Sequence, residues 1–139
     1  MEPKLNYPVF VLPKKSDMIF VFFKEVDLKS TTTEFLDKGG FVGDIIVDAF
    51  GNKYEIEKAY FKKYRGLLGY NPLLKGRQIL VDFHFAMELH PIALDEFKRI
   101  VHDRINKNKR LWLSSWNIDE LQAAIANSIS FEEISHLLK

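Results

Sequence analysis

The feature that most constrains the fold is an alternating run at residues 79–89. Every odd position in this run is apolar, whereas the even positions include Asp82, His84 and Glu88. Because side chains alternate across a strand, this pattern predicts a strand with one buried face and one polar face. Such a strand suits the interior of an antiparallel sheet that is covered on one side. Pro91 ends the run and suits the first position of a helix.

Length and composition predict one soluble domain. The chain has 139 residues and no cysteine, so it is the size of a single domain and lacks disulfides and thiolate metal sites. No apolar run is long enough to span a membrane, and no signal-peptide pattern opens the chain. We therefore expect one soluble domain over residues 1–139, with residues 1–90 mainly in strands and residues 91–139 in helices. The lack of cysteine is compatible with a reducing cytoplasm.

Two apolar segments precede the first glycine pair. Residues 7–12 contain Pro8 and are followed by Pro13, which favours an edge strand or an extended arm. Residues 18–26 are apolar on both faces, so we expect an inner strand there.

A hairpin is predicted between residues 41–50 and 53–64. Both segments alternate, and Gly51-Asn52 between them suits a type II′ turn because glycine stands first. A two-residue turn at this place puts Ile56 opposite Val47.

The last third of the chain has helical patterns. Residues 92–106 are apolar at helical spacing, and residues 111–116 read as an apolar connector. Asn117 with Glu120 and Ser130 with Glu133 form capping boxes, which predict the starts of two short helices. Strands first and helices last predict an α+β fold, with an antiparallel β-sheet and the C-terminal helices packed on one face.

The polar face of the alternating run is the strongest candidate for chemistry. Asp82 and His84 stand two residues apart, close enough to hold one metal ion or to share a proton. No compact histidine cluster and no third orienting group accompany them. Glycine-rich phosphate loops and the GxSxG elbow are also absent from the sequence. We therefore expect no catalytic residues, no metal site and no cofactor, and a polar face that is solvated.

Aromatic and basic residues interleave near the end of the predicted hairpin. Strand alternation would place Tyr60, Lys62 and Tyr64 on one face, as on platforms that bind single-stranded nucleic acid. The same pattern describes amphipathic residues at a sheet edge. Since the formal net charge is only +1, we expect nucleic-acid binding to be weak.

Two surfaces are candidates for binding a protein partner. Residues 53–77 carry seven basic and two acidic side chains, whereas residues 78–97 carry four acidic and no basic ones. Residues 66–76 are rich in leucine and either fold over a sheet edge or contact a partner. The first candidate surface consists of Lys62, Lys63, Arg65, Tyr70, Leu73 and Leu74. The rival surface is the polar strand face with Asp82, His84 and Glu88.

The segment GDIIVDAFGNKYEIEKA, the alternating strand and the terminal pattern Trp116…DEL…SFEEI extend over residues 40–138. In these features the chain resembles small bacterial immunity proteins of toxin–immunity systems. The resemblance implies that the chain binds a cognate toxin, often a nuclease, in the cytoplasm and neutralises it stoichiometrically without catalysis. The alternative is a nucleic-acid-binding or regulatory module that uses the basic aromatic hairpin at residues 53–65.

Overall fold

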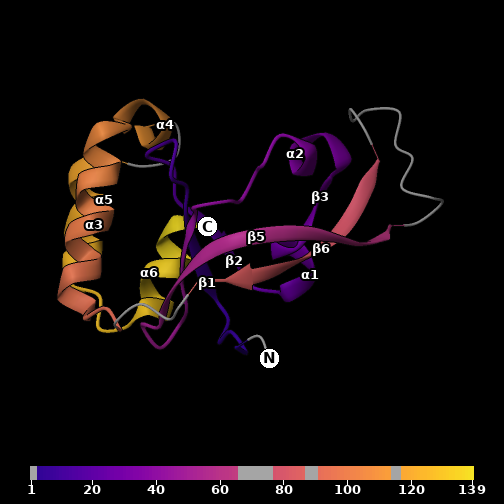
Figure 1. Cartoon of the computed structure of the whole chain (residues 1–139). Coiled ribbons are helices and arrows are strands. Elements are labelled where there is room, and N and C mark those ends of the chain that lie inside the picture. The colour runs from indigo at the N-terminus through magenta and orange to yellow at the C-terminus, as the bar shows by residue number, and fades with distance from the viewer. Residues whose placement is uncertain (1–2, 66–76, 87–90, 114–116) are drawn as a thin grey trace.

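The computed structural model describes residues 3–65, 77–86, 91–113 and 117–139. Within these ranges six strands form one curled antiparallel sheet in the order β2-β1-β4-β5-β6-β3 (Figure 1). The strands are β1 (Val9–Leu12), β2 (Phe20–Phe22), β3 (Ser30–Thr32), β4 (Ile45–Val47), β5 (Lys53–Tyr64) and β6 (Gln78–Phe85). The helices are α1 (Glu25–Leu28), α2 (Thr33–Asp37), α3 (Leu94–Lys107), α4 (Lys109–Leu113), α5 (Ile118–Ala126) and α6 (Phe131–Leu138). The predicted α+β class is confirmed.

The C-terminal helices cover one face of the sheet, as predicted. Alternate residues of the central strands, Phe10 and Val47 among them, face these helices and are fully buried. The ring of Phe10 lies 4.6 Å from that of Phe97 on α3. Further buried residues on this side come from α3, α5 and α6, and they include Val101, Ile105, Leu121, Ile125 and Ile134.

A second core lies on the face of the sheet opposite to the C-terminal helices. The neighbours of Phe10 and Val47 along the chain, Val9 and Ile46, point into it because side chains alternate across each strand. β5 and β6 contribute a row that includes Ile56, Ile79, Val81 and Phe83, and Leu28 of α1 is buried among them.

The alternating run forms an inner strand, as predicted, over the part that the structure describes. β6 lies between β5 and β3, and Ile79, Val81 and Phe83 are buried. His84 on the polar face is exposed. Residues 87–90, which complete the predicted run, lie outside the described residues.

The positions of the first two strands were predicted wrongly. β1 is an inner strand between β2 and β4, whereas β2 is a short edge strand of only three residues. The apolar segment at residues 18–26 leaves the sheet after β2 because α1 begins at Glu25 and buries Leu28 in the second core. Pairing with β4 on one side and β2 on the other makes β1 central, despite the neighbouring prolines.

The hairpin of β4 and β5 exists, but its predicted register is wrong. Val47 pairs with Lys53 and Ile46 pairs with Tyr54, so a five-residue connection replaces the two-residue turn. The connection is built around Asp48, whose fully buried carboxylate accepts hydrogen bonds from the backbone N–H groups of Phe50 and Asn52. The Gly51-Asn52 pair alone does not predict this longer connection, because the connection depends on hydrogen bonds to the Asp48 side chain, which is buried in the folded protein.

The helix starts agree with the predicted capping residues. The Asn117 side chain accepts a hydrogen bond from the Glu120 N–H, and the Ser130 hydroxyl accepts one from the Glu133 N–H, each at 3.1 Å. Each bond satisfies an N–H that the first helical turn leaves without a partner. Helix α3 runs from Leu94 to Lys107, close to the bounds predicted for the helix at residues 92–106. Part of the predicted connector at residues 111–116 forms α4.

Replacing Phe83 with alanine tests the central position of β6. The side chain is fully buried in the second core, so Phe83→Ala should lower the free energy of unfolding by about 3–5 kcal/mol through lost burial and the cavity left behind. Phe50 is 75% exposed, so the matched variant Phe50→Ala should change stability by less than about 0.5 kcal/mol. Urea denaturation of both variants measures this, and similar losses would contradict the assignment of Phe83 to the core.

Candidate interaction surface

The candidate surface lies on the ribbon that β5 and β6 form. The two strands pair along most of their lengths, and the end of the ribbon near Tyr64 and Ile79 extends away from the C-terminal helices (Figure 1). The helices cover the other part of the sheet, so nothing from α3–α6 packs on this end. Residues 60–64 are all exposed. This ribbon end contains Lys62 and Lys63 of the first predicted surface.

A β-bulge at Lys62 changes which side chains share a face. Phe61 pairs with Val81, but Lys63 pairs with Leu80, so Lys62 is an extra residue on β5. Because partners across a ladder lie on one face, the bulge places Tyr64 on the opposite face from Tyr60. The expected shared face of Tyr60, Lys62 and Tyr64 is therefore wrong.

The basic residues of the first predicted surface lie on the outer face of the ribbon, which is the face of Asp82. Lys63 pairs with Leu80, and the Lys62 Nζ atom lies 3.8 Å from Asp82 Oδ2. The Arg65 Nη1 atom donates a hydrogen bond to Ser30 Oγ, which belongs to the strand beside β6.

His84 stands two residues from Asp82 along β6 and so lies on the same face. The described residues of the two predicted surfaces therefore share one face. The outer face contains five basic and three acidic side chains, a formal excess of two positive charges. These are Lys29, Lys58, Lys62, Lys63 and Arg65 against Glu25, Glu57 and Asp82.

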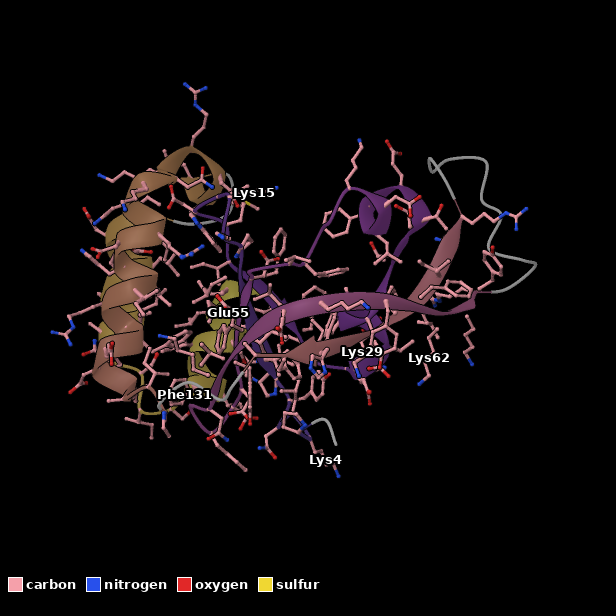
Figure 2. All side chains as sticks on the ribbon, in the orientation of Figure 1. Lys4, Lys15, Lys29, Glu55, Lys62 and Phe131 are labelled. Atoms are coloured by element: carbon pink, nitrogen blue, oxygen red, sulfur yellow. The ribbon has the colours of Figure 1, made fainter. Side chains whose placement is uncertain are left out.

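Asp82 is held by a lysine that sequence analysis did not identify. Lys29 Nζ lies 2.7 Å from Asp82 Oδ1 and 2.8 Å from Glu25 Oε1, and Figure 2 shows Lys29 and Lys62 on the same side of the ribbon. Burial alone would raise the pKa of Asp82, but the hydrogen bond and the charge of Lys29 outweigh burial and lower this pKa. Burial acts to lower the pKa of Lys29, yet its two carboxylate partners raise it. The pair therefore links the end of α1 to the middle of β6.

Two hollows flank this ion pair. One, of about 210 Å³, is lined by Tyr7, Glu25, Lys29, Asp82 and Phe85 together with residues of the N-terminal segment. Burial, reinforced by the charge of Glu25, raises the pKa of the Tyr7 hydroxyl to about 12. The other hollow, of about 240 Å³, is lined by Glu25, Val26, Lys29, Lys62, Leu80 and Val81. Lys62 therefore borders a hollow on the outer face that is lined by both charged and apolar side chains.

His84 has an acidic neighbour on this face. Its Nε2 atom lies 3.7 Å from Glu57 Oε2, and both side chains are well exposed. Within the described part of the chain, no three histidine, aspartate or glutamate side chains are grouped so that they could hold a metal ion. The absence of catalysis at Asp82 and His84 stays a prediction.

The opposite face of the ribbon end carries an aromatic cluster. Phe61 and Tyr64 have ring centroids 5.0 Å apart, and the Arg77 guanidinium carbon lies 5.1 Å from the Tyr64 ring centroid. Tyr60, Phe61 and Tyr64 are 42%, 46% and 39% exposed, so aromatic surface is available on both faces. Sequence analysis missed Arg77 because the bulge that brings Tyr64 to its face has no local signal.

Several residues of the predicted surfaces cannot be placed. Tyr70, Leu73 and Leu74 of the first surface and Glu88 of the second lie outside the described residues. The structure brings together Lys62, Lys63, Arg65, Asp82 and His84, which lie on one face.

Comparisons with protein-family models, curated proteins and solved structures found no match to this chain. Among the described residues, no helix is both long and apolar enough to cross a membrane.

The Lys29–Asp82 pair can be tested by its effect on acid stability. A pKa lowered by folding contributes stability above the unfolded value, near 3.8, and this contribution is lost as the pH falls through the folded value. Wild-type chain should therefore lose stability more steeply than Asp82→Asn below about pH 4. Urea denaturation across this pH range measures the slopes.

Lys29→Met provides the matched control, because it removes the cation and leaves the carboxylate in place. It should flatten the acid dependence as Asp82→Asn does, since the pKa of Asp82 is lowered mainly through Lys29. Equal slopes in wild type and both variants would show that the pair does not form in solution.

Proposed function

We propose that this chain is an interaction protein that binds a partner protein stoichiometrically and neutralises it, using the outer face of the β5–β6 ribbon end. The observation that carries this proposal is the joint exposure of Tyr60, Lys62 and Lys63 on a ribbon end that extends away from the C-terminal helices. Aromatic and cationic side chains of this kind commonly supply the anchors of a protein interface.

The partner that we propose is a cognate bacterial toxin, which the chain would bind in the cytoplasm as an immunity protein. The resemblance of residues 40–138 to immunity proteins supports this class of partner. A binding role also agrees with the sequence, which offers no catalytic motif. No catalysis, metal or cofactor is part of the proposed mechanism, because a tight complex that covers the toxin is sufficient for protection.

Charge favours an acidic contact face on the toxin. Asp82 already binds Lys29 at 2.7 Å, so its charge is compensated within the chain. Lys62 and Lys63 are exposed, and the outer face has a formal excess of positive charge. Complementary charge accelerates association and makes the rate fall as salt rises. The rival proposal of a basic nuclease contacting Asp82 is therefore less favoured.

Charge reversal tests the surface directly. Lys62→Glu combined with Lys63→Glu should slow association with the toxin by about tenfold or more, because both exposed cations become repulsive. Lys107→Glu combined with Lys109→Glu, at exposed positions on the C-terminal helices, changes the net charge equally and should leave association close to wild type.

In the proposed system an adjacent reading frame would encode the toxic domain, which would serve as the partner for stopped-flow binding and for a co-expression protection assay. If both double variants protect equally well and bind equally fast while remaining folded, the surface is wrongly assigned. A slower rate only for Asp82→Lys would favour the rival acidic contact.

Nucleic-acid binding is the alternative, and exposed Tyr60 beside Lys62 is the observation that favours it. The bulge places Tyr64 on the opposite face from Tyr60 and Lys62. Fewer nucleic-acid bases could therefore stack on the face that carries Lys62. We expect only non-specific binding, with Kd about 10⁻⁴ to 10⁻⁶ M at physiological salt. Fluorescence anisotropy with single-stranded oligonucleotides measures this, and salt-resistant, sub-micromolar binding would make the alternative the leading function.

A further inference from the structure

We propose that the partner binds by adding an extended strand to the free edge of β5 at residues 60–64, and that this strand alternates acidic and apolar residues. This inference rests on the proposed function and specifies the chemistry of the same ribbon end. Strand addition to an exposed sheet edge is a recurrent way in which proteins recognise an extended segment.

β5 is much longer than the strand that covers its other side. On β5, only Lys53, Tyr54 and Glu55 pair with β4. The last backbone bonds on that side of β5 join Ile56 to Gly43 and Asp44. Beyond Ile56, the described residues place no further strand along this edge. Strand β5 continues for eight more residues, of which the last five are exposed.

The backbone of this segment has donors and acceptors that point outward. Arg65 N–H binds the Gln78 carbonyl and Ala86 N–H binds the Glu55 carbonyl, so even-numbered residues of β6 face β5. Odd-numbered residues of β6 face β3, as the bond from Val81 N–H to the Lys29 carbonyl shows. Two residues opposite each other in an antiparallel ladder direct their backbone groups either toward each other or away from each other. Phe61 lies opposite Val81 and Tyr64 lies opposite Ile79, and these β6 residues point away from β5. The backbone N–H and C=O groups of Phe61 and Tyr64 therefore point away from β6.

These outward backbone groups form a vacant edge. Within the described residues, no backbone hydrogen bond to Phe61 or Tyr64 is present on that side. The side chains of both residues are exposed, so an incoming chain could reach this edge. Each bond that an added strand makes there would extend the existing ladder by one strand.

Charge indicates an acidic strand rather than a second copy of this chain. Lys58, Lys62 and Lys63 stand along the segment, and lysines on an edge strand oppose pairing between identical edges. Two copies joined edge to edge would bring these lysines together, because opposed strands place side chains of one face side by side. Carboxylates in the same positions would be attracted instead.

The two faces of the ribbon specify the alternation. One row of side chains on the added strand would lie beside Lys62 and Lys63 on the outer face, where carboxylates fit. The other row would lie beside Phe61 and Tyr64, whose rings contact each other at 5.0 Å, where apolar side chains fit. Because the rows of a strand alternate, the recognised segment alternates acidic and apolar residues.

Amide hydrogen exchange on the intact chain tests strand addition. The probe is a synthetic peptide that alternates glutamate and valine, and its control is a scrambled peptide of the same composition. The alternating peptide should slow exchange of the Phe61 and Tyr64 amides by about tenfold or more, because new ladder bonds protect them. The Lys98 amide, within α3, serves as an internal reference. Failure to bind, or binding that leaves both amides unprotected, would overturn the proposal.

A matched pair of variants isolates the backbone donor. Phe61→Pro and Phe61→Ala both remove the ring, but only proline removes the outward N–H, which β6 does not use. The proline variant should bind the alternating peptide at least about tenfold more weakly than the alanine variant. Equal affinities in folded variants would overturn the proposal, and if Phe61→Pro fails to fold, the exchange measurement on the unaltered chain decides.

Toxin protection separates this inference from the proposed function. In one outcome, the Lys62→Glu, Lys63→Glu variant no longer protects against the toxin, but folded Phe61→Pro and Phe61→Ala protect equally well. This outcome would support the proposed surface and reject strand addition. If neither the charge reversal nor the proline substitution affects protection, the surface and the strand addition are both rejected. Loss of toxin protection in Phe61→Pro but not in Phe61→Ala supports both the proposed surface and strand addition.

Discussion

The buried carboxylate of Asp48 is the interaction on which the arrangement of this fold depends. It accepts five hydrogen bonds from Asn6, Phe50 and Asn52, and no part of the residue is exposed. The same loop accepts the Ile92 N–H at the Gly51 carbonyl, next to the start of the helical part. A side chain at Gly51 would meet the Ile92 carbonyl, so this junction has no room for a larger residue. The φ of Gly51 is also positive, at 83°, which glycine adopts readily. The N-terminal segment, the sheet and the helices are thus connected at one place.

From this junction β5 runs outward, and its length explains why a binding surface is available. The two cores lie on opposite faces of the central strands, and both draw on β1 and β4. Beyond the last buried residues of β5, the C-terminal helices α3–α6 do not cover the ribbon end (Figure 1). The exposed lysines and rings of this end therefore stay accessible, and their exposure on both faces suits recognition of another chain.

The Lys29–Asp82 pair has a structural part in this design. It links α1 to β6 beside the place where β3 begins, and so supports the outer face on which Lys62 and Lys63 lie. Because Asp82 is compensated by Lys29, the charge that a partner meets comes mainly from the exposed lysines. The bulge at Lys62 divides the rings between two faces, so Tyr60 lies with the lysines on the outer face, whereas Tyr64 lies with Phe61 on the opposite face.

The sequence alone determined the features that depend on neighbours along the chain. Alternation identified the buried residues of β6, helical spacing identified α3, and Asn117 and Ser130 identified two helix starts, because these patterns act within a few residues. Tertiary structure decided the central place of β1, the register around Asp48, the Lys29–Asp82 pair and the bulge at Lys62. Each of these depends on a partner far along the chain or on burial, and neither is specified by local spacing. The sequence therefore indicated part of the candidate surface, Lys62, Lys63 and Asp82 among its residues, but the division of this surface into faces arose only from strand pairing.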